Sequence, residues 1–167
     1  SLHDGAKLVR LRGQYMQAAV PVGVGAMAAV LGADDALVVQ NCTDCSSNES
    51  MVVPANYNSP GQIVIGGHLE AVDRAIASLQ AIGIRKIVKL PVSVPSHTPL
   101  MRAAAERLGL AIQAIQWQMP DRSIIHNVDA QSKDSVTAIQ QALMAQLYLP
   151  VQWTQCTQAL KAQGVLH

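Results

Sequence analysis

Two residues in this sequence, Arg12 and His97, combine a reactive side chain with an unusual position. Arg12 lies almost opposite the polar stripe of an expected helix, and its neighbours one turn away are Leu8 and Met16. A guanidinium among apolar residues keeps its charge and needs an anionic partner, and its paired N–H donors suit a carboxylate best. An internal salt bridge, or a side chain that reaches water, would also satisfy it.

His97 stands in Pro95-Ser96-His97-Thr98-Pro99, between an expected strand and an expected helix. Prolines on both sides restrict the backbone and could hold the imidazole in a fixed direction. A histidine held in this way is suited to act as a general base. The alternative is a loop histidine that only forms hydrogen bonds with the chain.

Two further motifs are weak. Cys42 and Cys45 form a C-x-x-C, but there is no second pair to complete a zinc site, and no central strand precedes the motif as in a redox pair. The stretch from Gly23 to Ala28 loosely matches a dinucleotide-binding G-x-G-x-x-A, yet a helix precedes it and a strand follows, the reverse of what that site requires. The histidines lack metal-like spacing, so no metal site is predicted, and neither a P-loop nor a G-x-S-x-G turn occurs.

Composition narrows the protein class. The chain has 167 residues, of which 50% are hydrophobic and 14% charged, enough for one ordinary domain or a compact domain with a small one. A net charge of +1 and 3% aromatic residues argue against a nucleic-acid binder. No apolar run is long enough for a membrane span. Three cysteines cannot all pair, which favours a reducing, cytoplasmic compartment.

Hydrophobic periodicity predicts the elements that position these residues. A first helix is expected from Asp4, its N-cap, to Ala19, because Leu8, Leu11 and Tyr15 share a stripe and Pro21 follows. Between Gly25 and Leu90 the predicted order is strand, helix, strand, strand, helix, strand. That α/β order is ferredoxin-like, with an antiparallel sheet carrying both helices on one face. The strands are expected at 26–31, 51–57, 62–67 and 86–90, and the helices at 33–45 and 68–82.

After Leu90 the pattern becomes mostly helical. Helices are expected at 100–108, at 133–147 with Ser132 as the cap, and at 151–162, and Ser123–Val128 is expected to be a strand. One strand among several helices does not make a sheet. Residues 1–24 and 91–167 are therefore interpreted as pieces of a layer whose other strands are missing.

Six segments together resemble the malonyl-CoA–acyl carrier protein transacylases of bacterial fatty acid synthesis, and the resemblance covers essentially the whole chain. They are LRGQYMQAAVP (Leu11–Pro21), GAMAAVLG (Gly25–Gly32), NYNSPGQIVIGG (Asn56–Gly67), LPVSVPSHTPLM (Leu90–Met101), NVDA (Asn127–Ala130) and QLYLPVQW (Gln146–Trp153).

This resemblance implies that a serine takes malonyl from coenzyme A and passes it to the thiol of an acyl carrier protein. Arg12 matches the residue that grips the malonyl carboxylate, and His97 matches the base that activates the serine. Asn56 and Asn58 match positions near the cleft. Coenzyme A enters as a thioester substrate, and no cofactor is implied. The implied fold is a ferredoxin-like small subdomain, residues 25–90, inserted in a larger α/β-hydrolase-like subdomain that includes 1–24 and 91–167.

One feature of the family is absent. Its nucleophilic serine belongs to a G-x-S-x-G turn that precedes the arginine helix, and no serine here has that context. We therefore expect the chain to correspond to the middle and C-terminal part of a transacylase and to be inactive by itself. Two other interpretations are a polyketide-type acyltransferase that uses a branched malonyl unit, and a non-catalytic ferredoxin-like module that binds a small molecule.

Overall fold

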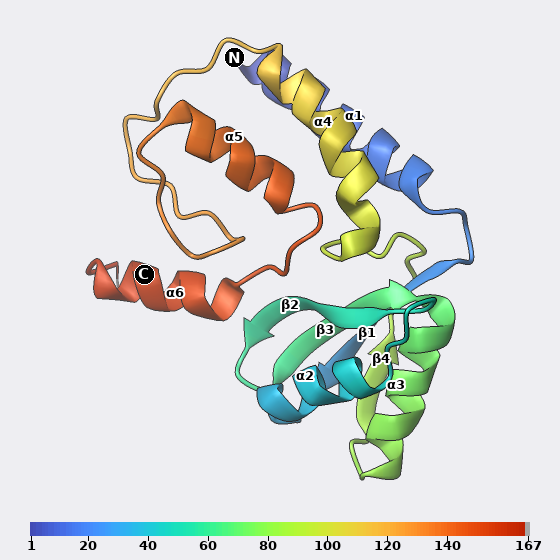
Figure 1. Cartoon of the computed structure of the whole chain (residues 1–167). Coiled ribbons are helices and arrows are strands. Elements are labelled where there is room, and N and C mark those ends of the chain that lie inside the picture. The colour runs from blue at the N-terminus through green and yellow to red at the C-terminus, as the bar shows by residue number, and fades with distance from the viewer. Residues whose placement is uncertain (166–167) are drawn as a thin grey trace.

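A four-stranded sheet with two helices on one face forms one part of the molecule, and a second group of helices lies beyond it (Figure 1). The structure is a computed structural model that describes residues 1–165. The α/β class predicted from the sequence is confirmed. Among residues 1–165, no helix has the length and hydropathy needed to cross a membrane.

The sheet part follows the predicted order of strands and helices. Its elements are β1 (Gly25–Leu31), α2 (Asp35–Asp44), β2 (Val52–Ser59), β3 (Gln62–His68), α3 (Leu69–Ala81) and β4 (Lys86–Lys89). The strands lie in the order β2-β3-β1-β4, and every neighbouring pair is antiparallel. Pro60 and Gly61 join β2 to β3. Gly61 has φ 73°, the positive value that the third position of a type II turn requires when proline occupies the second.

Alternation along the strands gives the sheet two different faces. On β1, Ala28 and Val30 point toward α2 and α3 and pack in one core with Leu79. Met27, on the opposite face, packs in a smaller cluster with Val64. The helices therefore cover one face, and the other face turns toward the segment that follows β4.

The helical part contains α1 (Leu2–Ala19), the short 3-10 turn η1 (Pro99–Met101), α4 (Arg102–Gln113), α5 (Val136–Ala145) and α6 (Trp153–Ala162). α1 and α4 run side by side (Figure 1) and share an apolar core with the end of α5. Met16, Met101, Leu108 and Leu147 are buried in this core. Cation–π contacts of Arg107 with Tyr15 and of Arg102 with Tyr148 lie on its surface.

Three local predictions for this part were wrong. Ser1 caps α1, and Asp4 is the third helical residue, whose side chain completes a capping box. The segment 123–128 is not a strand, because its only ladder contact within residues 1–165 is an isolated bridge between His126 and Gln131. α5 begins after Ser135, whose hydroxyl accepts from the N–H of Ala138 at 3.3 Å, and not after Ser132.

The two parts meet along β2. The N–H of Tyr57 donates to the carbonyl of Val151 at 2.8 Å, and the N–H of Val151 donates to the carbonyl of Ala55 at 2.9 Å. This parallel bridge holds the start of α6 against the edge strand of the sheet. It also places β2 near the helical part.

Candidate active site

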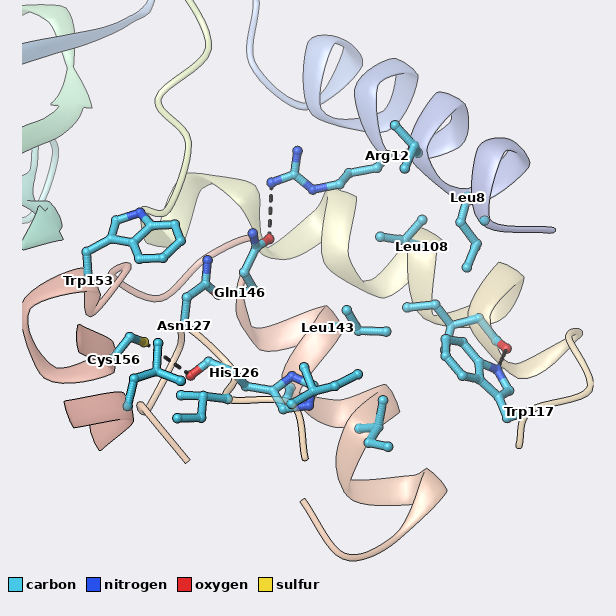
Figure 2. Close-up of a pocket in the computed structure, with 18 residues that line it drawn as sticks. Leu8, Arg12, Leu108, Trp117, His126, Asn127, Leu143, Gln146, Trp153 and Cys156 are labelled. Atoms are coloured by element: carbon cyan, nitrogen blue, oxygen red, sulfur yellow. Dashed lines mark hydrogen bonds between the residues drawn. The ribbon is translucent and has the colours of Figure 1, made fainter. Parts of the chain in front are cut away.

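Arg12 lies on the face of α1 that turns toward α5 and is half-buried. Its Nη2 donates to the side-chain oxygen of Gln146 at 3.1 Å (Figure 2). Within residues 1–165 the ion pairs are Ser1 with Asp4, Asp73 with Lys89, and Asp129 with Lys133, so none involves Arg12. Burial lowers the pKa of Arg12, but a guanidinium stays protonated at neutral pH. Within residues 1–165, this half-buried cation therefore has only a neutral amide as its partner.

The Arg12 groove is an apolar cavity of about 640 Å³ between α1, α4, α5 and α6. Figure 2 shows Leu8, Leu108, Leu143 and Trp153 around it, with the Arg12 side chain extending across toward α5. No Asp, Glu or Lys lies among its lining residues, all of which belong to the described part of the chain. They are Gly5, Leu8, Val9, Arg12, Leu108, Ile112, Trp117, Ile124, Ile125, His126, Asn127, Ile139, Ala142, Leu143, Gln146, Trp153, Cys156 and Leu160.

His97 meets the same short segment as Arg12. Its Nδ1 lies 2.7 Å from the main-chain oxygen of Gln146, and its main-chain N–H donates to the carbonyl of Leu147 at 3.0 Å. The structure therefore brings the two residues singled out from the sequence to one point, the C-terminal end of α5. Arg12 contacts the Gln146 side chain there, and His97 contacts the backbone.

The backbone of His97 is held in an uncommon conformation. Its φ is 62°, in the left-handed region that residues with a side chain rarely adopt. The surrounding segment is tightly fixed, because Thr98 is fully buried and its hydroxyl donates to the carbonyl of Pro95 at 2.7 Å. Strained residues of this kind persist only where neighbouring contacts determine their conformation, and they cluster at functional sites.

The hydrogen bond at Nδ1 determines the tautomer of His97. A carbonyl oxygen only accepts, so Nδ1 carries the proton and Nε2 keeps the lone pair of a base. Burial lowers the pKa of His97 most strongly, the bond to Gln146 raises it, and the positive charge of Arg12 lowers it. The net effect is a lowered pKa, which keeps the ring neutral at physiological pH.

His97 lines a second cavity, the His97 cleft, of about 520 Å³. Asn56 on β2 lines the same cleft, so the structure brings these two predicted residues together. Asn58, two residues further along β2, is not among the lining residues of either cavity. The cleft is lined by Gln17, Met27, Asn56, Leu90, Pro91, Val92, Ser93, Val94, Ser96 and His97, none of which carries a full charge at neutral pH.

Gln146 was assigned no role from the sequence, although it lies within the quoted segment QLYLPVQW. A signal was present in the helical spacing, because Ile139, Leu143 and Gln146 fall on one stripe at intervals of four and three. A glutamine at the end of an apolar stripe points a polar group toward buried surroundings, where it needs a partner.

The cysteine pair lies away from both cavities, at the C-terminal end of α2. Cys42 is buried against the sheet core, and burial raises the pKa of its thiol to about 12. A thiol in this state is a poor nucleophile and a poor metal ligand. Within residues 1–165, no cluster of three His, Cys, Asp or Glu side chains suits a metal ion.

Comparisons with known proteins give consistent results. Residues 1–166 match the family described as "Acyl transferase domain". The chain is 46% identical over 164 residues to a malonyl CoA-acyl carrier protein transacylase of Escherichia coli (strain K12), covering 98% of this chain and 53% of that protein. Its sequence is 63% identical to that of malonyl-CoA:acyl carrier protein transacylase from Xanthomonas oryzae pv. oryzae. The crystal structure of that protein matches this structure with a TM-score of 0.96 over 99% of this chain and 52% of that one.

A second similar structure is a complex of a type II PKS acyl-carrier protein with its malonyl-transacylase. It is 42% identical to this chain, with a TM-score of 0.91 over 95% of this chain and 51% of that one. The chain thus spans about half the length of the curated relatives and solved structures that it matches.

Proposed function

The chain belongs to the acyl transferase domain family, and we propose that the protein containing it transfers malonyl from coenzyme A to the thiol of an acyl carrier protein. The similar proteins named malonyl CoA-acyl carrier protein transacylase support this activity. The complex of a malonyl-transacylase with a carrier protein supports the partner.

A single observation supports the choice of acyl group. Arg12 is half-buried and positively charged, and within the described residues it is hydrogen-bonded only to a neutral amide. A malonyl thioester ends in a free carboxylate, whereas an acetyl thioester ends in a methyl group. The N–H groups that Gln146 leaves free can bind that carboxylate through two parallel hydrogen bonds. Arg12 would thereby select acyl groups that carry a terminal negative charge.

His97 supplies the proton transfers. Its Nε2 accepts the proton of the attacking serine hydroxyl, the serine oxygen bonds to the thioester carbonyl, and the C–S bond breaks as His97 returns the proton to the coenzyme A sulfur. In the second half, Nε2 accepts the proton of the carrier thiol, and the thiol sulfur bonds to the ester carbonyl. The bond between the carbonyl carbon and the serine oxygen then breaks as His97 returns the proton to that oxygen. The Nδ1 bond to Gln146 holds the ring in the required tautomer throughout.

No serine in the sequence lies in a G-x-S-x-G turn, so the nucleophile in this proposal comes from outside residues 1–167. Backbone N–H groups beside that serine would hold the oxyanion. We expect residues 1–167 alone to be inactive. Asn56 lies in the cleft of His97 and is assigned to binding the substrate. Asn58 remains a weaker candidate for the same role.

The arrangement of the subdomains is part of the proposal. Residues 25–90 would form a ferredoxin-like subdomain, supported by the antiparallel order β2-β3-β1-β4. Residues 1–24 and 91–167 would belong to an α/β-hydrolase-like subdomain, and the apolar Arg12 groove would face the rest of that subdomain. We expect the reaction to need no cofactor beyond the thioester substrate, and we expect the protein to work in the cytoplasm.

The test is a transfer assay with the complete protein that contains this chain. Malonyl-CoA, methylmalonyl-CoA and acetyl-CoA are each offered with a carrier protein bearing phosphopantetheine, and the acylated carrier is measured by mass spectrometry. The carrier without phosphopantetheine and the His97→Ala variant are the controls. The proposal predicts efficient transfer of malonyl that both controls abolish.

Other outcomes would change the assignment. Faster transfer of methylmalonyl than of malonyl would favour the polyketide-type acyltransferase. No transfer of any acyl group, together with no thermal stabilisation by malonyl-CoA, would contradict the proposal. Stabilisation by amino acids alone would favour the non-catalytic binding module.

A further inference from the structure

Thr98, the residue after His97, has a side chain that connects the segment between β4 and α4 to the sheet (Figure 1). The residue is fully buried. Its hydroxyl donates to the carbonyl of Pro95 at 2.7 Å. Its methyl group faces Gly66 on β3, where a Cβ would lie only 3.1 Å from the methyl carbon. Polar side chains are rarely buried so completely unless their hydrogen bond is part of the local structure.

The hydroxyl of Thr98 does not serve the 3-10 turn that follows it. Thr98 is the N-cap of η1, a position where a threonine side chain usually accepts from an N–H of the first turn. Among the described residues it forms no such capping bond. The main-chain carbonyl of Thr98 accepts from the N–H of Met101, and the hydroxyl turns back by three residues to Pro95. That hydrogen bond therefore closes the turn of residues 95–98, which contains His97.

His97 occupies a strained position within this turn. Its φ of 62° costs free energy for a residue with a side chain, so the conformation persists only where neighbouring contacts hold it. Before the strained residue, the N–H of Ser96 donates to the carbonyl of Val94 at 2.9 Å. After it, the side chain of Thr98 holds the turn closed. Without that hydroxyl, the backbone of His97 can relax toward an ordinary conformation, and the imidazole moves with it.

The methyl group of Thr98 rests on the sheet. Gly66 pairs with Met27 of β1, and a Cβ at Gly66 would lie 3.4 Å from the Met27 side chain, so both positions share the face opposite α2 and α3. Because Gly66 has no side chain, the methyl group of Thr98 can approach the β3 backbone closely. The sheet therefore supports the turn that carries His97.

We propose that Thr98 is a positioning residue for the proton transfers of His97: its hydroxyl holds the His97 backbone in the left-handed conformation, and its methyl group fixes the turn against Gly66. This inference rests on the proposed function. Thr98 lines neither the Arg12 groove nor the His97 cleft, so it acts through His97 and not through the acyl group. Its loss should therefore affect malonyl and acetyl transfer alike, unlike the loss of Arg12.

The first test compares Thr98→Val and Thr98→Ser in the complete protein, with kcat and KM measured for malonyl-CoA and acetyl-CoA. Valine keeps the shape and the methyl group without the hydroxyl, and serine keeps the hydroxyl without the methyl group. Thr157→Val is the matched control. The Thr157 hydroxyl on α6 also donates to a carbonyl three residues earlier, at 2.9 Å, but Thr157 is exposed and lines neither cavity.

Thr98→Val should lower kcat by about 10- to 100-fold with both thioesters, because a displacement of about 1 Å at a catalytic group can cost about 100-fold. KM should change by less than about threefold, since the acyl group keeps its own contacts. Thr98→Ser should keep kcat within about threefold of wild type, because the hydroxyl that closes the turn remains. Thr157→Val should leave kcat and KM unchanged.

The pH profile separates a displaced His97 from a smaller folded fraction. Burial is the main cause of the lowered pKa of His97, and Arg12 is the charged group that acts on it. The other groups around the ring, from α1, β1, β2, the segment 90–96 and the end of α5, carry no charge at neutral pH. A loosened turn exposes the ring to water, so the acid limb of kcat/KM in Thr98→Val should move up toward pH 6.5. A smaller folded fraction lowers the rate at every pH without moving the limb.

A second pair of substitutions tests the contact with the sheet. In Gly66→Ala the new Cβ would lie 3.1 Å from the Thr98 methyl carbon, so the turn must shift. A shift of a fraction of an ångström should lower kcat by about three- to tenfold. Adding Thr98→Ser removes the methyl carbon, so the double variant should return to within about threefold of Thr98→Ser alone.

Three results would overturn the inference. They are full activity in Thr98→Val, an equal loss in Thr98→Val and Thr98→Ser with an unmoved acid limb, and a double variant no more active than Gly66→Ala. A wild-type protein that transfers no acyl group would instead contradict the proposed function itself. Thermal unfolding of every variant shows whether the fold is retained, and the Gly66 variants provide the test if Thr98→Val does not fold.

Discussion

Replacing Arg12 by alanine gives the most direct test of how the acyl group is selected. In the complete protein, Arg12→Ala should reduce malonyl transfer far more than acetyl transfer. The reason is chemical, since only malonyl offers a carboxylate to the guanidinium. Arg12 has no acidic partner within residues 1–165, so the substitution does not leave a buried carboxylate unpaired.

The magnitude follows from the surroundings of Arg12. Losing one partner of a buried charged pair costs about 2–5 kcal/mol. Arg12 is half-buried, so we expect a loss at the lower end of this range, about 2–3 kcal/mol. Because a factor of ten corresponds to about 1.36 kcal/mol, this loss corresponds to a reduction of kcat/KM by about 30- to 150-fold. Acetyl transfer should change by less than about threefold, because its transition state makes no use of the charge.

The assay follows transfer from each coenzyme A thioester to the carrier protein at several substrate concentrations, so that kcat and KM are obtained separately. Arg10→Ala is the control, because Arg10 lies on the exposed face of the same helix. Arg12→Lys keeps the charge without the paired donors, so it should recover only part of the malonyl activity.

The reasoning is refuted if malonyl and acetyl transfer fall by the same factor in Arg12→Ala while the protein remains folded. That result would mean that Arg12 maintains the structure around Gln146 and does not read the carboxylate. Loss of the Arg12 bond also leaves the Gln146 amide without a partner. The thermal unfolding temperature of each variant must therefore be measured beside the kinetics.

Three further predictions concern other parts of the molecule. The pKa of His97 lies below the ordinary 6.5, chiefly because of burial, so the acid limb of kcat/KM should fall below pH 6.5. The stability that depends on neutral His97 should be present above pH 6.5 and lost as the pH falls through the lowered pKa. An acid limb above pH 6.5 would contradict this prediction. A methyl group at Gly25 would lie 2.7 Å from the Ser93 carbonyl oxygen, so Gly25→Ala should lower the free energy of unfolding, measured in urea, by about 1–3 kcal/mol. Gly13 on α1 has nothing within 4 Å of that position, so Gly13→Ala should raise the free energy of unfolding by about 0.5–1 kcal/mol. Iodoacetamide at pH 8 should modify Cys45 before Cys42, whose pKa of about 12 leaves almost no thiolate, and equal labelling in peptide mapping would show that Cys42 is accessible.

Local patterns were sufficient to predict much of this molecule. The order of strands and helices between residues 25 and 90 follows from periods of two and about 3.6 residues, and these periods depend only on neighbouring residues. The unusual position of Arg12 also follows from the sequence, because a charged residue away from the polar stripe of its helix is visible without any tertiary contact. The prolines around His97 indicated a restricted loop in the same way.

Tertiary packing decided how these residues are used. The segment 123–128 has a strand-like composition but lines the Arg12 groove, since a strand forms only where a neighbour supplies hydrogen bonds. The meeting of Arg12 and His97 at Gln146 joins α1, the loop before α4 and the end of α5. No periodicity spans those separations. The tautomer and the lowered pKa of His97 depend on that meeting, because burial, a carbonyl and a nearby charge act only once the chain has folded.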